Sequence, residues 1–116
     1  VDLRHVSSAL GERALSSVWR ARDIWATGEA TEELEILDED TAISGHRLLD
    51  LSQRVIQIID GVFSAFDSDS ASPWVVVEAR DSSYYAVHSS EDSVLAAVSQ
   101  SFHSVVPYEY PVTSPR

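Results

Sequence analysis

The acidic loop that begins at Asp67 is the stretch that comes nearest to a metal site. Asp67, Asp69 and Glu78 fall at the first, third and twelfth positions of a calcium-binding loop, which need carboxylate ligands. Ala71, however, stands at the fifth position, where an oxygen ligand belongs, and Ser72 replaces the glycine of the sixth. We therefore interpret this stretch as a solvated polar loop, and we expect no metal and no cofactor.

Histidine and carboxylate side chains offer one candidate pocket. His46 and Asp50 are four residues apart, the spacing at which two side chains of a helix meet, so they could share a ligand or a proton. His88, at the end of a strand-like run, is the third member. The same spacing is typical of a surface hydrogen bond near a helix start. A small enzyme or ligand-binding domain that uses His46, Asp50 and His88 is our alternative hypothesis, and it requires these side chains to converge.

The motifs of the common enzyme classes are missing from the sequence. There is no cysteine, which excludes thiolate catalysis, disulfides and zinc–thiolate sites. No G-x-S-x-G, phosphate-binding or dinucleotide-binding glycine pattern occurs, and the four glycines are far apart. An enzyme is therefore the less favoured class, and we assign no catalytic residue.

The charge of the chain points to a protein partner. The formal net charge is −11, from 19 acidic residues and eight arginines, so a nucleic-acid partner is not expected. The acidic residues are concentrated: 31–60 holds eight of them against two arginines. We predict that the segment 32–40 faces a basic protein, through six carboxylates: Glu32, Glu33, Glu35, Asp38, Glu39 and Asp40.

The predicted partner surface also includes apolar side chains, at positions that we expect to face solvent. Trp and Tyr are enriched in the cores of protein interfaces. We expect Leu15 and Trp19 on the polar side of the first helix, and the others on the second face of a hairpin. The predicted apolar partner-binding residues are Leu15, Trp19, Trp74, Val76 and Tyr85.

Length and composition indicate one globular domain. The 116 residues, with 44% hydrophobic and 23% charged residues, suit a single core. The longest apolar run is far shorter than a membrane span, so we expect a soluble cytoplasmic protein without a membrane partner. We assign 1–104 to the domain and 105–116 to an extended tail rich in proline and tyrosine.

Apolar spacing predicts the first half of the fold. Three- and four-residue steps of apolar residues predict a helix over 3–26. Alternation in 31–37 favours a short strand. Ser44 stands where an N-cap belongs, ahead of a central helix that we end at Gly61, with a strand at 62–66. The alternative at that point is one helix that continues to Phe66.

The second half contains the clearest pattern. The runs 74–79 and 84–88 are β-branched and aromatic, and they predict an antiparallel hairpin. If its loop residues are Asp81 and Ser82, one face carries Trp74, Val76, Tyr85 and Val87, which we expect to hold two copies of the chain together. A last helix opens after Ser90 and ends near His103.

Together these expectations give an α+β fold and a binding function. We predict three helices against a small, mainly antiparallel sheet of about three to four strands, in the order α-β-α-β-β-β-α. The predicted core is Val55, Ile59, Val75, Val77, Leu95, Val98 and Phe102. The predicted function is that of a small acidic, non-catalytic protein-interaction module that forms a homodimer and masks a basic partner, as immunity or inhibitor proteins do.

Overall fold

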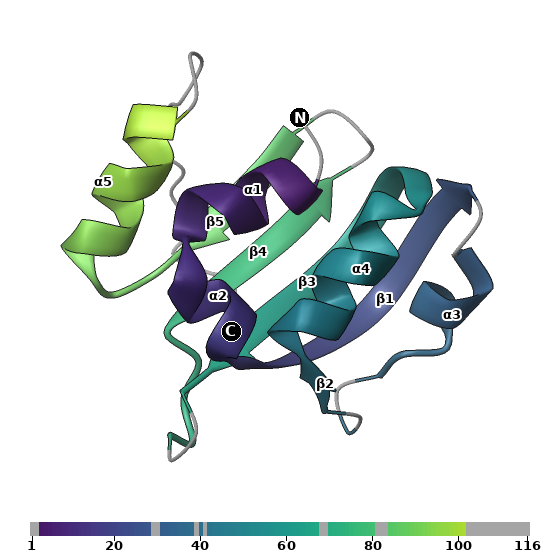
Figure 1. The fold of residues 1–116 in the computed structure, drawn as a ribbon, viewed down its shortest axis with the longest axis horizontal. Coiled ribbons are helices and arrows are strands. Elements are labelled where there is room, and N and C mark those ends of the chain that lie inside the picture. The colour runs from purple at the N-terminus through teal and green to yellow at the C-terminus, as the bar shows by residue number, and fades with distance from the viewer. Residues whose placement is uncertain are drawn as a thin grey trace, which may run out of the picture.

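Helices cover one face of an antiparallel sheet (Figure 1). A computed structural model of the chain describes residues 3–28, 31–38, 40, 42–67, 70–80 and 84–101. The elements are α1 (Leu3–Leu10), α2 (Glu12–Ser16), β1 (Val18–Gly28), α3 (Thr31–Glu35), β2 (Ile43–Ser44), α4 (Gly45–Gln53), β3 (Val55–Phe66), β4 (Val75–Arg80), β5 (Tyr84–His88) and α5 (Asp92–Ser101). The strands lie in the order β2-β1-β3-β4-β5, and every neighbouring pair is antiparallel.

The α+β class is confirmed, but the number of elements is larger than predicted. The described residues form five strands and five helices instead of three or four strands and three helices. β1 comes from a segment that we expected to be helical, and the two-residue β2 lies where we expected only the N-cap of the central helix. The predicted tail, 105–116, lies outside the described residues.

The predicted helix over 3–26 is wrong from Val18 on, and its first part is two short helices, α1 and α2. Gly11 has φ of 79°, a left-handed conformation that ends α1, and α2 ends at Ser16. The chain then extends as β1, in which Trp19 and Ala21 are buried while Arg20 and Arg22 lie on the opposite face. This period-2 alternation is the stronger signal in 18–22, and the helical spacing of the apolar residues there is coincidental.

The predicted strand at 31–37 is also wrong, because Thr31–Glu35 forms α3. Alternation would have buried Leu34 and Ile36 on the same side. Instead Leu34 is fully buried against β1 and Ile36 is 78% exposed. Glutamate and leucine are good helix formers, and one buried residue per turn is sufficient to hold so short a helix.

The central helix begins as predicted and ends earlier. The Ser44 hydroxyl accepts a hydrogen bond from the backbone N–H of Arg47 at 3.1 Å, which confirms the N-cap. The helix ends at Gln53, and β3 begins at Val55 rather than at Val62. The β-branched run Val55–Ile59 explains the difference, because such residues prefer an extended backbone.

The predicted hairpin of β4 and β5 is confirmed, but its register differs by one residue. Arg80 pairs with Tyr84, and Val76 pairs with His88. Tyr85 and Val87 therefore share a face with Val77, and not with Val76 as predicted. A shift of one residue moves every side chain of a strand to the other face of the sheet.

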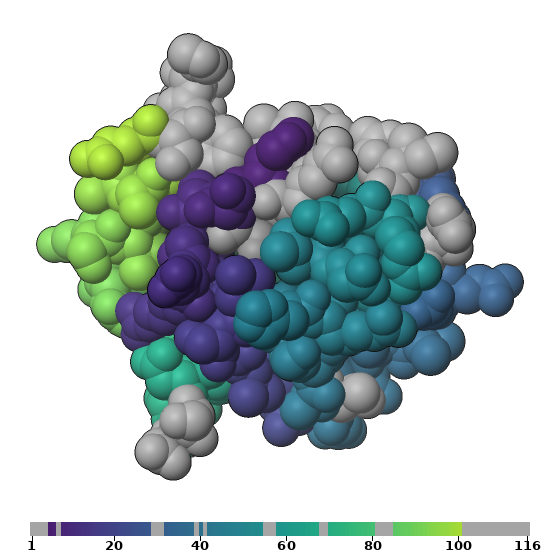
Figure 2. Space-filling model, in the orientation of Figure 1, coloured from purple at the N-terminus to yellow at the C-terminus, as the bar shows by residue number. Residues whose placement is uncertain are grey.

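The core lies between the helices and the sheet. Its members come from all layers: Val6, Ala14, Trp19, Ala21, Ala26, Leu34, Leu48, Leu51, Ile58, Phe63, Ala65, Trp74, Val75, Val77, Ala79 and Val94. Figure 2 shows the helix side, where α1 and α2 (purple) and α4 (teal) cover the middle of the molecule. The described helices leave the opposite side of the sheet uncovered, and we call that side the helix-free face.

Two members of the predicted core are placed differently. Val75, Val77 and Val98 are buried as predicted. Ile59 is only partly buried, and Leu95 is exposed on the outer side of α5. The side chain of Val55 and the whole of Phe102 lie outside the described residues.

Candidate functional site

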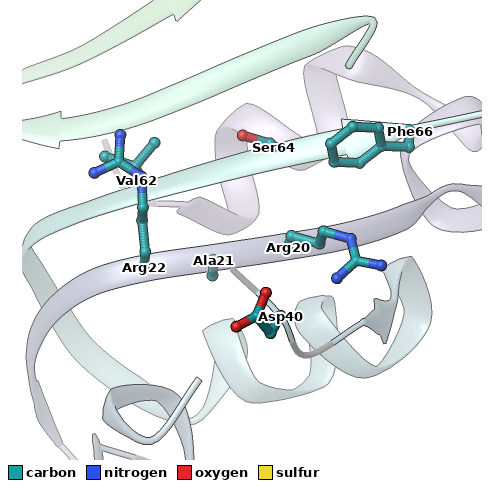
Figure 3. A pocket seen from close by; sticks show the side chains of 7 residues that line it. All are labelled: Arg20, Ala21, Arg22, Asp40, Val62, Ser64 and Phe66. Atoms are coloured by element: carbon teal, nitrogen blue, oxygen red, sulfur yellow. The ribbon is translucent and has the colours of Figure 1, made fainter. Parts of the chain in front are cut away.

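A shallow hollow lies on the helix-free face, between β1 and β3 (Figure 3). Its volume is about 290 Å³. Register explains its lining, because directly opposed residues share a face: Arg20 lies opposite Ser64, and Arg22 lies opposite Val62. The full lining is Arg20, Ala21, Arg22, Asp40, Val62, Ser64 and Phe66.

The two arginines give the hollow its chemistry. Guanidinium groups at positions i and i+2 of a strand point to the same side, and each can bind a carboxylate or a phosphate through two parallel hydrogen bonds. Negative groups of the same chain already lie beside them. Asp40 lines the hollow, and Arg22 Nη1 donates to Asp23 Oδ2 at 2.6 Å. The surface is therefore one of mixed charge.

A second, more open hollow of about 700 Å³ lies on the other side of Arg22. Ile24 and Leu37 contribute its apolar part, and both pack against the core. Charged residues complete the lining: Arg22, Asp23, Glu35 and Asp38. The strand bends here, because Asp23 has φ of 56° and the pairing of β1 with β3 shifts between Arg22 and Trp25.

The predicted acidic surface lies on α3 and on the segment that follows it. The described carboxylates are all exposed: Glu32, Glu33, Glu35, Asp38 and Asp40. Glu39 lies outside the described residues. Glu35 also has a structural role, because its Oε2 accepts a hydrogen bond from the backbone N–H of Ala26, on the outer edge of β1, at 3.1 Å. The carboxylates thus share one edge of the molecule.

Arginines of α4 and of the turn that ends it offset part of this negative charge. Arg47 Nη2 lies 2.8 Å from Glu33 Oε2, and Arg54 Nη2 lies 3.3 Å from the same oxygen. Asp50 contacts both arginines, at 3.0 and 3.4 Å. All four side chains are solvent-exposed to a large extent, so each pair adds little to stability. Their effect is to order α3 against the end of α4.

The predicted apolar surface is mostly inside the molecule. Trp19 of β1 and Trp74, which directly precedes β4, are both buried in the core. Tyr85 packs against the same core, and Leu15 and Val76 are partly buried. As placed here, the two tryptophans offer no surface to a partner, which corrects their predicted position.

Two other apolar side chains are exposed, one on β1 and one directly after α3. Trp25 is 58% exposed, and Ile36, directly after α3, is 78% exposed. Trp25 lies opposite Asp60 in β3, which places it at the far end of the helix-free face. We missed both because we placed Trp25 on the apolar stripe of a helix and Ile36 on the buried side of a strand. No local pattern identifies Trp25, because continuing the alternation of 18–22 would bury it with Trp19 and Ala21; the shift of pairing between Arg22 and Trp25 turns it to the other face.

The structure does not bring His46, Asp50 and His88 together. His46 and Asp50 are exposed on α4, which covers the helix side of β1 and β3. His88 pairs with Val76 and so lies on the helix-free face. The sheet separates the three side chains, and neither hollow contains any of them.

His88 instead lies beside the buried carboxylate of Glu78. Glu78 is 2% exposed, and its Oε1 is 3.6 Å from His88 Nε2. Its other oxygen accepts a hydrogen bond from Arg80. A buried carboxylate needs such partners, because an unpaired charge in a protein interior is strongly unfavourable.

A second polar cluster joins α2 to the far ends of β3 and β5. Arg13 donates to Asp67 Oδ2 at 2.7 Å and to Glu91 Oε1 at 2.8 Å, and its guanidinium lies 4.1 Å from the ring centre of Trp74. The indole N–H of Trp74 donates to Ser17 Oγ at 2.9 Å. The hydrogen bonds to Asp67 and then to Glu91 raise the pKa of Arg13, and the Arg13 guanidinium lowers the pKa of both carboxyls. The cluster fastens separate elements together.

Acid is expected to weaken this cluster. Folding lowers the pKa of Asp67 and of Glu91, so their ionised forms stabilise the folded state. This contribution to the free energy of unfolding is complete above the unfolded pKa of about 4, and it is lost as the pH falls through the pKa of the folded state. The urea midpoints of the wild type and of Arg13→Gln should therefore differ most near neutral pH and converge in acid. A difference of the same size at both ends of the pH range would contradict the assignment.

Comparisons with models of known protein families, with curated proteins and with solved structures found no match to this chain. Within the described ranges, no three histidine or acidic side chains gather as metal ligands. No described helix has the length and hydropathy needed to cross a bilayer. The chain's own geometry must therefore support any proposal about its function.

Proposed function

We propose that the chain is a small, non-catalytic protein-interaction module that self-associates and masks a basic partner. The partner-binding surface is the acidic edge, which we define as Glu32, Glu33, Glu35, Ile36, Asp38, Glu39 and Asp40. The proposal includes a cytoplasmic location and no nucleic-acid partner, as the charge of the chain suggests.

One observation supports the proposal most strongly: an exposed apolar side chain lies among exposed carboxylates. Among the large hydrophobic side chains in the described part of the chain, Ile36 is the most exposed, and Glu32, Glu35 and Asp38 surround it in sequence and are exposed too. An apolar contact gives affinity, and the surrounding charges give orientation and fast association with a basic surface. The alternative, a pocket of His46, Asp50 and His88, lacks the convergence that it requires.

Capture of partners by matched variants tests the proposal. The bait proteins are the wild type, Ile36→Ser and Glu32→Gln, each incubated with extract from the native source. We expect the wild type to capture a recurrent basic protein, and Ile36→Ser to recover about tenfold less of it, because a buried apolar contact is lost at the interface. Glu32→Gln should reduce recovery by a smaller factor.

Two controls make the same kinds of change elsewhere on the surface. Leu95→Ser removes an exposed apolar side chain from α5, and Glu12→Gln removes an exposed carboxylate from α2. Both should capture the same partner as the wild type. Recovery of the same proteins by Ile36→Ser and the wild type would contradict the proposed surface.

A further inference from the structure

The helix-free face carries a second surface of interface type, along β1. We call it the β1 strip and define it as Val18, Arg20, Arg22 and Trp25. Val18 and Trp25 are two of the four exposed large hydrophobic residues in the described chain. Tryptophan and arginine are the residue types that most often dominate the binding energy of protein interfaces. The strip is separate from Ile36, which follows α3.

A protruding side chain and a recess lie at neighbouring positions of β1. Trp25 is 58% exposed, and the 700 Å³ hollow begins at the residue before it, Ile24. Ile24 and Leu37 give the hollow an apolar floor, and charged groups form its rim. When a protrusion and a recess lie this close together, a twofold axis can place the protrusion of each copy in the recess of the other.

The charges of the strip also suit a second copy. Each chain carries a net charge of −11, so two copies repel each other over most of their surface. Arg20 and Arg22 on the strip alternate with Asp23, Asp38 and Asp40 around the two hollows. Because both signs are present side by side, a twofold axis can oppose arginines of one copy to carboxylates of the other.

We infer that two copies of this chain associate through the β1 strip about a twofold axis, with Trp25 of each copy in the Ile24–Leu37 hollow of the other. The inference rests on the proposed function only in taking the chain to be self-associating. It replaces the hairpin face that the sequence indicated, because Trp74, Tyr85 and Val87 of that face pack against the core of their own chain.

Sedimentation equilibrium of the full chain tests the apolar contact between Trp25 of one copy and the Ile24–Leu37 hollow of the other. We expect a dimer at micromolar concentration for the wild type, and at least tenfold weaker association for Trp25→Ser. The matched control, Leu95→Ser, removes an exposed apolar side chain far from β1 and should leave the dimer unchanged. Circular dichroism of each variant checks that it is folded. A monomeric wild type, or a Trp25→Ser variant that associates as tightly as the wild type, would overturn the inference.

A charge exchange between copies tests the twofold arrangement. Arg22→Glu and Asp38→Arg should each be monomeric. A twofold dimer contains two equivalent contacts, and each substitution places two like charges against each other in both of them. An equal mixture of the two should form a heterodimer, since both contacts then join opposite charges. A mixture that stays monomeric would overturn the arrangement. Asp38 also belongs to the acidic edge, but these measurements contain no basic partner. Capture of that partner is tested separately with Ile36→Ser, so failure of the dimer and failure of the proposed function give different results.

Discussion

Replacing Gly45 with alanine is expected to lower the free energy of unfolding by about 3 kcal/mol. A Cβ at this position would lie 2.0 Å from the carbonyl oxygen of Ala14 and 2.6 Å from that of Leu15. Both are backbone atoms of α2, so no side chain can rotate away to make room. The first turn of α4 is also held there by the hydrogen bond from Gly45 N to Ser17 O, at 3.1 Å. Urea unfolding of both proteins measures the effect.

Gly11→Ala is the control for this prediction. Gly11 has φ of 79° and ψ of −160° but nothing within 4 Å of an added Cβ, so alanine there meets only backbone strain of about 1 to 3 kcal/mol. The two variants therefore separate close packing from conformational freedom. A Gly45→Ala variant that is more stable than Gly11→Ala would show that α2 and α4 do not approach each other as described.

Replacing Phe63 with alanine is expected to cost about 3 to 5 kcal/mol, through lost transfer free energy and the cavity that remains. Phe63 is fully buried, and it lies on the central strand β3 between Ala21 of β1 and Val77 of β4. Its ring is thus enclosed by the two neighbouring strands and the helix layer. The urea midpoint, measured at one protein concentration because the chain is expected to self-associate, reports the loss.

Phe66→Ala provides the matched comparison on the same strand. Phe66 is three residues away, on the helix-free face, and is only partly buried. Its truncation should cost less than half as much as that of Phe63. Equal costs would mean that the two faces of β3 are equally covered, contrary to the one-sided layer of helices.

The parts of the fold that could be predicted from sequence are those with local signals. Ser44 was identified as an N-cap because a hydroxyl at that place satisfies a backbone N–H within its own turn. The hairpin of β4 and β5 was identified from its β-branched runs. Its register was not, because one residue more in the loop moves Tyr85 and Val87 to the other face, and no local pattern fixes the length of the loop.

The parts that could not be predicted depend on contacts between distant segments. Val18, Ala21 and Trp25 fit helical spacing as well as they fit a bent strand, and the pairing of β1 with β3 decides between them. Pairing with a distant strand overrides a local preference of a few tenths of a kcal/mol per residue. The acidic segment was visible in the sequence, but the exposure of Ile36 within it depends on which side of α3 packs against β1.

The salt dependence of binding between the wild type and its captured partner tests the central claim most directly. The comparison is the triple variant Asp38→Asn, Glu39→Gln and Asp40→Asn, which keeps an oxygen acceptor for the hydrogen bond from Asp40 N to position 38. We predict that the variant binds more weakly and that its affinity falls less steeply with rising salt, because three carboxylates no longer face a basic surface. The same affinity and the same slope for both proteins would contradict the account.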